Sequence, residues 1–172
     1  MRKLIFSLPI LALAACQTTG SATQDTQPQT AAAGSSQTSV SADAAFDHGV
    51  KFCIGYLQSG TPIETLSNVG FRKSLDAWST KPFLASSSFE DPKVYVTTVR
   101  GDECFVTITP KTRNEMVSYF ARAERVLSAQ GYRKEVRTFR KGRKFTYFIK
   151  GTNEISLQAS TSGTIVSVHL AN

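Results

Sequence analysis

The chain is basic and long enough for one domain with a hydrophobic core. It has 172 residues, of which 20 are Lys or Arg and 13 are Asp or Glu, so its formal net charge is +7. Its two histidines and three cysteines supply few ligands for a metal ion, and it has no glycine-rich loop of the phosphate-binding kind. We therefore expect neither a metal site nor a cofactor.

The N-terminus combines a basic start, an apolar stretch and a small-residue end. Arg2 and Lys3 precede a mostly apolar stretch over 4–13, and the segment ends in Leu13-Ala-Ala-Cys16. The stretch is shorter than the about 20 apolar residues that a transmembrane helix needs. This arrangement is typical of a cleaved export signal.

The ending Leu13-Ala-Ala-Cys16 resembles the lipobox of bacterial lipoproteins. In that family the thiol carries a diacylglyceryl group, cleavage precedes the cysteine, and the new amine is usually acylated too. The resemblance implies a signal peptide over 1–15 and a lipid membrane as the partner of acylated Cys16 in the bacterial cell envelope. Because Gln17 rather than Asp follows, it also implies the outer membrane, with the protein facing the periplasm. The alternative is a secreted protein in which Cys16 is incidental.

Residues 16–41 are expected to be the lipidated cysteine and a disordered tether. Gln, Thr, Ser, Ala and Gly dominate the composition over 17–41, which also contains Pro28, has Asp25 as the only charge and has no aromatic residue. Such a segment buries too little apolar surface to offset its chain entropy. We therefore place a single periplasmic domain at 42–172.

The first half of this domain is predicted to contain two helices and three strands. Apolar residues recur at helical spacing over 42–58. Thr61 and Glu64 have the spacing of a capping box, which predicts a short helix ending near Gly70. A Ser/Pro-rich loop is expected over 79–92. Strands are expected at 71–78, 94–99 and 103–109, the last two forming a hairpin.

The second half is predicted to be one helix followed by a four-stranded meander. A capping box at Thr112 and Glu115 begins a helix that runs to Gln130. Its buried face is expected to consist of Met116, Phe120, Ala123 and Leu127. The strands are expected at 132–139, 143–150, 154–160 and 164–170. The predicted fold class is α+β, an antiparallel β-sheet with helices packed on one face.

The two halves contain similar segments. Leu66–Lys73 and Leu127–Lys134 each run from a helix end through Gly and an aromatic residue into a basic strand. This similarity favours a tandem unit of one helix and three strands, with one continuous sheet whose other face is open for binding or oligomerisation. Convergence is the alternative, because Gly after a helix and an aromatic residue at a strand start are both common.

Cys53 and Cys104 form an even pair once Cys16 is lipidated. In an exported domain such a pair predicts a disulfide, closing a loop of about 50 residues and contributing about 4 kcal/mol. Two buried free thiols are one alternative. A metal site is the other, although only His48 and His169 could supplement the two cysteines.

The strongest local feature of the domain is a basic cluster around the hairpin turn at Gly142. It consists of Arg133, Lys134, Arg137, Arg140, Lys141, Arg143 and Lys144. We interpret it as a candidate anion-binding surface, for phospholipid, lipopolysaccharide, peptidoglycan or an acidic envelope protein. Export excludes nucleic acid as the expected partner. The alternative is a solvated edge hairpin whose cations prevent edge-to-edge pairing.

Candidates for catalysis are weak. Ser86, Ser87 and Ser88 lie outside any nucleophile-elbow pattern, and neither His48 nor His169 has a recognisable partner set. The lone Trp78 is expected to pack rather than to bind. We therefore expect a membrane-anchored, non-catalytic binding or scaffolding module, with a binder of anionic lipid or cell-wall polymer, or a hydrolase with an unrecognised site, as alternatives.

Overall fold

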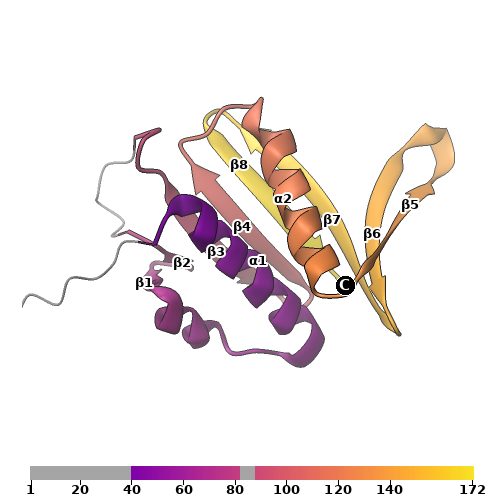
Figure 1. The fold of residues 1–172 in the computed structure, drawn as a ribbon, viewed down its shortest axis with the longest axis horizontal. Coiled ribbons are helices and arrows are strands. Elements are labelled where there is room, and N and C mark those ends of the chain that lie inside the picture. The colour runs from indigo at the N-terminus through magenta and orange to yellow at the C-terminus, as the bar shows by residue number, and fades with distance from the viewer. Residues whose placement is uncertain (1–39, 82–87) are drawn as a thin grey trace, which may run out of the picture. The chain divides into compact units, whose positions relative to one another are not determined.

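The computed structural model describes residues 40–81 and 88–172, which form one antiparallel sheet with helices against one face (Figure 1). The predicted signal peptide, Cys16 and the tether up to residue 39 lie outside the described residues, as do residues 82–87. The helices are α1 (Ala42–Ser59), the 3-10 helix η1 (Ile63–Val69), α2 (Glu115–Ala129) and the 3-10 turn η2 (Arg140–Gly142). The strands are β1 (Arg72–Ser74), β2 (Ala77–Ser79), β3 (Lys93–Val99), β4 (Glu103–Thr109), β5 (Arg133–Thr138), β6 (Lys144–Lys150), β7 (Asn153–Ser162) and β8 (Ile165–Ala171).

The eight strands follow the order β1-β2-β3-β4-β8-β7-β6-β5. Helix α1 packs on β3 and β4, while α2 packs on β7 and β8, so that both helices cover the same face. The α+β class, with one continuous antiparallel sheet, is therefore confirmed. Among the described residues, no helix has the length and apolar character needed to span a bilayer.

The sheet consists of two four-stranded meanders, each preceded by a helix. Strands β1–β4 form one and β5–β8 the other, and their last strands pair antiparallel at the centre, where Val106 lies opposite Val168. The predicted unit of three strands is therefore wrong in number. The strand predicted over 71–78 divides into β1 and β2, because the chain turns between them at Leu75, whose φ is 54°.

The two similar segments end their helices in the same way. Gly70 and Gly131 have φ values of 87° and 85°, which an L side chain rarely adopts. After each glycine an aromatic N–H donates back into the preceding helix: Phe71 to the carbonyl of Leu66, and Tyr132 to that of Leu127, both at 3.2 Å. The rings of Phe71 and Tyr132 are buried, and each leads into an edge strand, β1 or β5.

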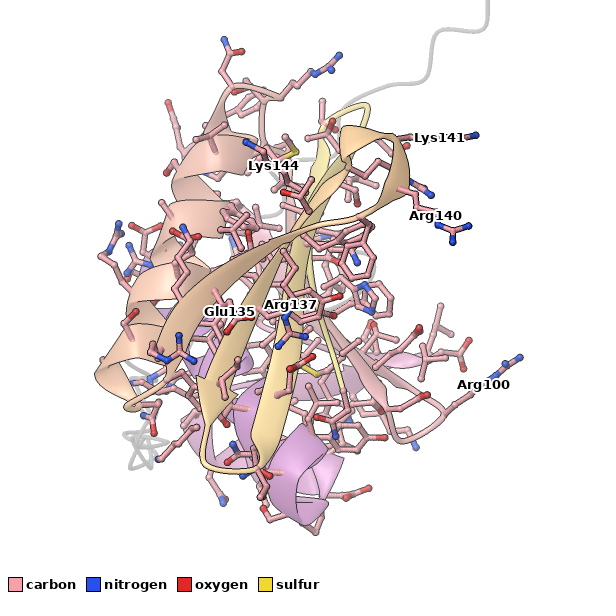
Figure 2. The ribbon with its side chains drawn as sticks, turned by 90° about the vertical axis from the view of Figure 1, so that its right-hand side faces the viewer. Arg100, Glu135, Arg137, Arg140, Lys141 and Lys144 are labelled. Carbon is pink, nitrogen blue, oxygen red and sulfur yellow. A yellow bond between two sulfur atoms is a disulfide. The ribbon has the colours of Figure 1, made fainter. Side chains whose placement is uncertain are left out.

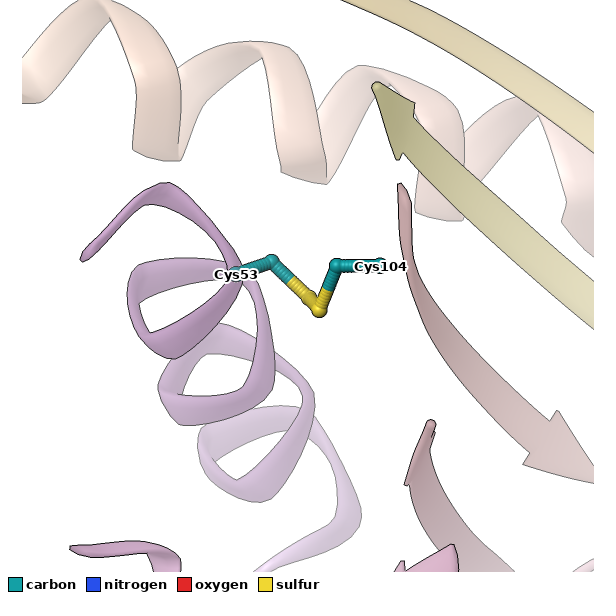
Figure 3. Close-up of a disulfide and its surroundings, with 2 residues drawn as sticks. All are labelled: Cys53 and Cys104. Carbon is teal, nitrogen blue, oxygen red and sulfur yellow. A yellow bond between two sulfur atoms is a disulfide. The ribbon is translucent and has the colours of Figure 1, made fainter. Parts of the chain in front are cut away.

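Helix α1 lies unusually close to the sheet at Gly49. A Cβ atom there would lie 2.9 Å from a methyl carbon of Val106 and 3.0 Å from one of Val96. The same helix carries Cys53, whose disulfide with Cys104 on β4 confirms the predicted pair (Figure 3). Both cysteines are fully buried and their Cα atoms lie 5.5 Å apart. The bond therefore ties α1 to the middle of the sheet.

The buried face of α2 is shifted from the predicted one. Ala123 and Leu127 are buried as expected, whereas Met116 and Phe120 are only partly buried. Tyr119 is buried instead, because its ring packs edge-on against Phe46 of α1 at 4.8 Å. The burial of Tyr119 depends on its contact with α1, so the spacing of apolar residues within α2 could not predict it. The remaining buried residue on α2 is Val126.

Of the two predicted capping boxes, the first is absent and the second is partly formed. At the first, η1 begins after Pro62 with no side-chain cap, and the hydroxyl of Thr61 lies 3.3 Å from that of Ser59, so this box is wrong. At the second, the Glu115 carboxylate accepts the Thr112 backbone N–H at 2.8 Å. That bond lowers the pKa of Glu115. The helix itself begins only at Glu115, so the box is half formed.

Candidate functional site

The β5–β6 hairpin divides the basic cluster into a paired base and an unpaired end. At the base, the guanidinium of Arg137 donates to both carboxylate oxygens of Glu154, at 2.8 and 2.7 Å, and to Glu135 at 2.7 Å. It also lies over the ring of Tyr147, 4.4 Å from the centroid. These carboxylates raise the pKa of Arg137. Arg137 is thus held in place by its neighbours (Figure 2).

The other two cations at the base are also paired. Arg133 lies 3.3 Å from Glu135, and Lys134 forms an ion pair with Glu124 of α2. The pKa of Glu135 is lowered, chiefly by its hydrogen bond from Arg137. Three of the seven predicted cations therefore form ion pairs within the domain.

The remaining four cations surround the turn, a segment we call the basic tip (Phe139–Lys144). Its cations are Arg140, Lys141, Arg143 and Lys144. All four are exposed, and none forms a side-chain hydrogen bond or ion pair within residues 40–81 and 88–172. The turn is closed by the Phe139 N–H, which donates to the carbonyl of Arg143 at 2.8 Å. Lys141 and Gly142 both have positive φ, at 67° and 71°.

An aromatic side chain lies beside these cations. Phe139 is 48% exposed, although its ring contacts Phe145 edge-on at 5.3 Å and Tyr147 at 6.5 Å. A single exposed apolar side chain is ordinary on a protein surface, so Phe139 bears on binding only together with the charges beside it. The basic tip therefore offers an apolar group and four unpaired charges together.

The cations of the basic tip point in two directions. Figure 2 shows Arg140 and Lys141 projecting away from the helices, toward the side of the uncovered sheet face. Arg100, in the turn between β3 and β4, projects toward the same side. Lys144 points the other way, toward α2. One flat surface facing the uncovered side of the sheet could therefore meet cations from two separate turns.

The two histidines lie on separate elements, His48 on α1 and His169 on β8. His169 on β8 stacks against Phe105 at 4.3 Å, and its Nε2 lies 3.9 Å from Glu103. His48 is half-buried on α1. Ser88 accepts the N–H of Asp91 at 3.2 Å through its hydroxyl. Ser86 and Ser87 lie outside the described residues.

Two further sequence expectations concern Trp78 and metal binding. Trp78 on β2 packs against the core, as predicted. Within the part of the chain that the structure describes, no three His, Cys, Asp or Glu side chains are grouped so as to hold a metal ion.

In comparisons with known proteins, the chain matches no protein-family model, no curated protein and no solved structure at a significant level.

Proposed function

We propose that this protein is a lipid-anchored, non-catalytic binding module of the bacterial outer membrane, facing the periplasm, whose basic tip makes a second contact with an anionic membrane surface. The observation that carries the proposal is the division of the basic cluster. Three cations at the base are neutralised, whereas Arg140, Lys141, Arg143 and Lys144 are exposed and unpaired beside Phe139.

A membrane surface fits both chemical features of the basic tip. Each cation near an anionic bilayer contributes about 1 kcal/mol, and an exposed aromatic ring gains from entering the interface. Because Arg100 projects toward the same side as Arg140 and Lys141, a flat surface suits the arrangement better than a point ligand. Peptidoglycan carboxylates would satisfy the cations but would give Phe139 no apolar phase.

With the proposed lipid anchor in place, a weak second contact would be enough to hold the basic tip at the membrane surface. If Cys16 is acylated, about 25 residues of tether hold the domain near the bilayer at a high effective concentration. The basic tip would then need only the modest affinity that two to four charges provide. Lipid anchorage and tip binding are separable parts of the proposal.

We expect the chain from residue 16, with Cys16→Ser, to co-sediment with vesicles containing phosphatidylglycerol and not with phosphatidylcholine vesicles. Arg140→Gln with Lys141→Gln should weaken this binding about 30-fold, because two charges at about 1 kcal/mol each are lost. The matched control is Lys51→Gln with Arg125→Gln, which removes the same charge from exposed helix positions. Equal weakening by the two variants would reduce the effect to net charge and overturn the tip's role.

A further inference from the structure

Strand β7 is longer than the part of it that β6 covers. β7 runs from Asn153 to Ser162 and pairs with β8 from Ser156 to Ser162, but the β6 ladder ends where Thr146 lies opposite Leu157. Beyond that point the hairpin diverges from β7, as Figure 1 shows. The segment Gln158–Ser162 therefore has an edge inside the sheet that no strand of the described residues occupies.

The register identifies the backbone groups on this free edge. Residues of an antiparallel strand bond alternately to their two neighbours. The two-residue turn after Ser162 makes Ser162 and Ile165 a bonded pair, so that Ser160 also bonds to β8. Ala159 and Thr161 therefore direct their N–H and carbonyl groups toward the free edge. Leu157 lies two residues before Ala159, so its backbone groups point to the same side, where they bond to Thr146 of β6.

A cleft of about 270 Å³ lies at the start of this edge. Phe120 of α2 lines one side, and Lys144 and Phe145 of β6 line another. On β7 the cleft is lined by Leu157, Gln158 and Ala159. Lys144 has no partner among the described residues and points toward α2, so the cleft has one free positive charge, and its exposed lining is more polar than apolar.

The free edge lacks the usual protection against strand addition. Natural edges carry charges, prolines or bulges that prevent pairing with other chains. The outer edge strand β5 follows this rule, with Arg133, Lys134 and Arg137 along it. The segment Gln158–Ser162 has only uncharged residues and no proline. The outer edge at β5 thus carries charges that oppose strand addition, whereas the edge of β7 at Gln158–Ser162 carries none.

We infer that Gln158–Ser162 is a docking site for an extended acidic peptide of a partner protein, which adds as a strand to β7 and places a carboxylate beside Lys144. Main-chain bonds to Ala159 and Thr161 would supply affinity, and the cleft with Lys144 would supply selectivity. This site shares Lys144 with the basic tip, whereas Arg140 and Lys141, the cations that the vesicle experiment tests, project from the opposite side of the hairpin.

The test uses a fluorescent heptapeptide, Thr-Val-Glu-Val-Glu-Val-Thr, with the chain from residue 16 carrying Cys16→Ser. Ala159→Pro removes the free-edge N–H and leaves the bonds to β8, so we expect at least tenfold weaker binding. Lys144→Gln should weaken binding severalfold. The matched control is Val136→Pro, because by the same alternation Val136 faces the outer edge of β5. It should change binding less than twofold.

Hydrogen exchange provides a measurement that needs no variant. The peptide should slow exchange of the Ala159 and Thr161 amides and leave those of Lys134 and Val136 unchanged. The inference is overturned if the peptide does not bind at 1 mM, if a lysine-for-glutamate version binds equally well, or if Val136→Pro alone weakens binding. A dimer that Ala159→Pro abolishes would assign the edge to a second copy and also overturn it. The vesicle experiment with Arg140→Gln and Lys141→Gln tests the membrane contact separately, so that failure of one proposal can be told from failure of the other.

Discussion

Replacing Cys53 and Cys104 together by alanine is expected to lower the free energy of unfolding by about 4 kcal/mol. The disulfide spans a sequence separation of 51, and the entropy of closing a loop of this length gives that magnitude. A domain of this size is typically stable by about 5–15 kcal/mol, so the loss is a large fraction of the total. Thermal unfolding followed by circular dichroism should show a melting temperature about 10–15 °C lower.

Reduced wild-type protein is the control for this experiment. Reduction retains both sulfur atoms, so it separates loss of the cross-link from the cavity that alanine leaves in the fully buried site. We expect reduction alone to give most of the effect. If reduced and oxidised protein unfold at the same denaturant concentration, the stabilising role of the disulfide is contradicted.

The second large effect concerns the proposed lipid anchor. Cys16→Ala should move the protein from the membrane fraction to the soluble fraction, because the acyl chains that hold it would no longer be attached. Arg140→Gln with Lys141→Gln should stay in the membrane fraction, since the basic tip is the weaker contact. Mass spectrometry of wild-type protein extracted with detergent should show a chain beginning at Cys16 with added acyl mass.

Two results would contradict the anchor. One is retention of Cys16→Ala after a high-salt wash, with the signal removed. The other is a wild-type mass without acyl groups. Either would leave the domain and its basic tip as described but would remove the argument that a tether supplies effective concentration. The vesicle experiment would then have to show an affinity sufficient on its own.

Much of the fold was predictable because local signals and tertiary structure agree. The hairpin turns at Gly151 and Gly163 have positive φ and lie between the strands predicted at 143–150, 154–160 and 164–170, which the structure contains as β6, β7 and β8. The strand over 71–78 was mispredicted because its turn uses Leu75, a residue type that rarely adopts φ of 54° and gives no turn signal. The face of α2 was mispredicted because Phe46, on another helix, decides that Tyr119 is buried.

The candidate site was only half predictable. The sequence identified seven cations on one hairpin, but it could not separate paired from unpaired ones. Arg137 reaches Glu154, two strands away, and Lys134 reaches Glu124 on α2, and both contacts depend on how the hairpin twists over its neighbours. The exposed Phe139 and the free edge of β7 depend on the same geometry.

The most direct test of the membrane contact is to place a fluorescent reporter at the basic tip. Trp78 is the only tryptophan, so Trp78→Phe with Phe139→Trp makes residue 139 the sole indole. Added phosphatidylglycerol vesicles should shift its emission to shorter wavelength, and phosphatidylcholine vesicles should not, because the ring enters the interface only when the cations bind. Unchanged emission in protein that co-sediments with the anionic vesicles would contradict the proposed contact.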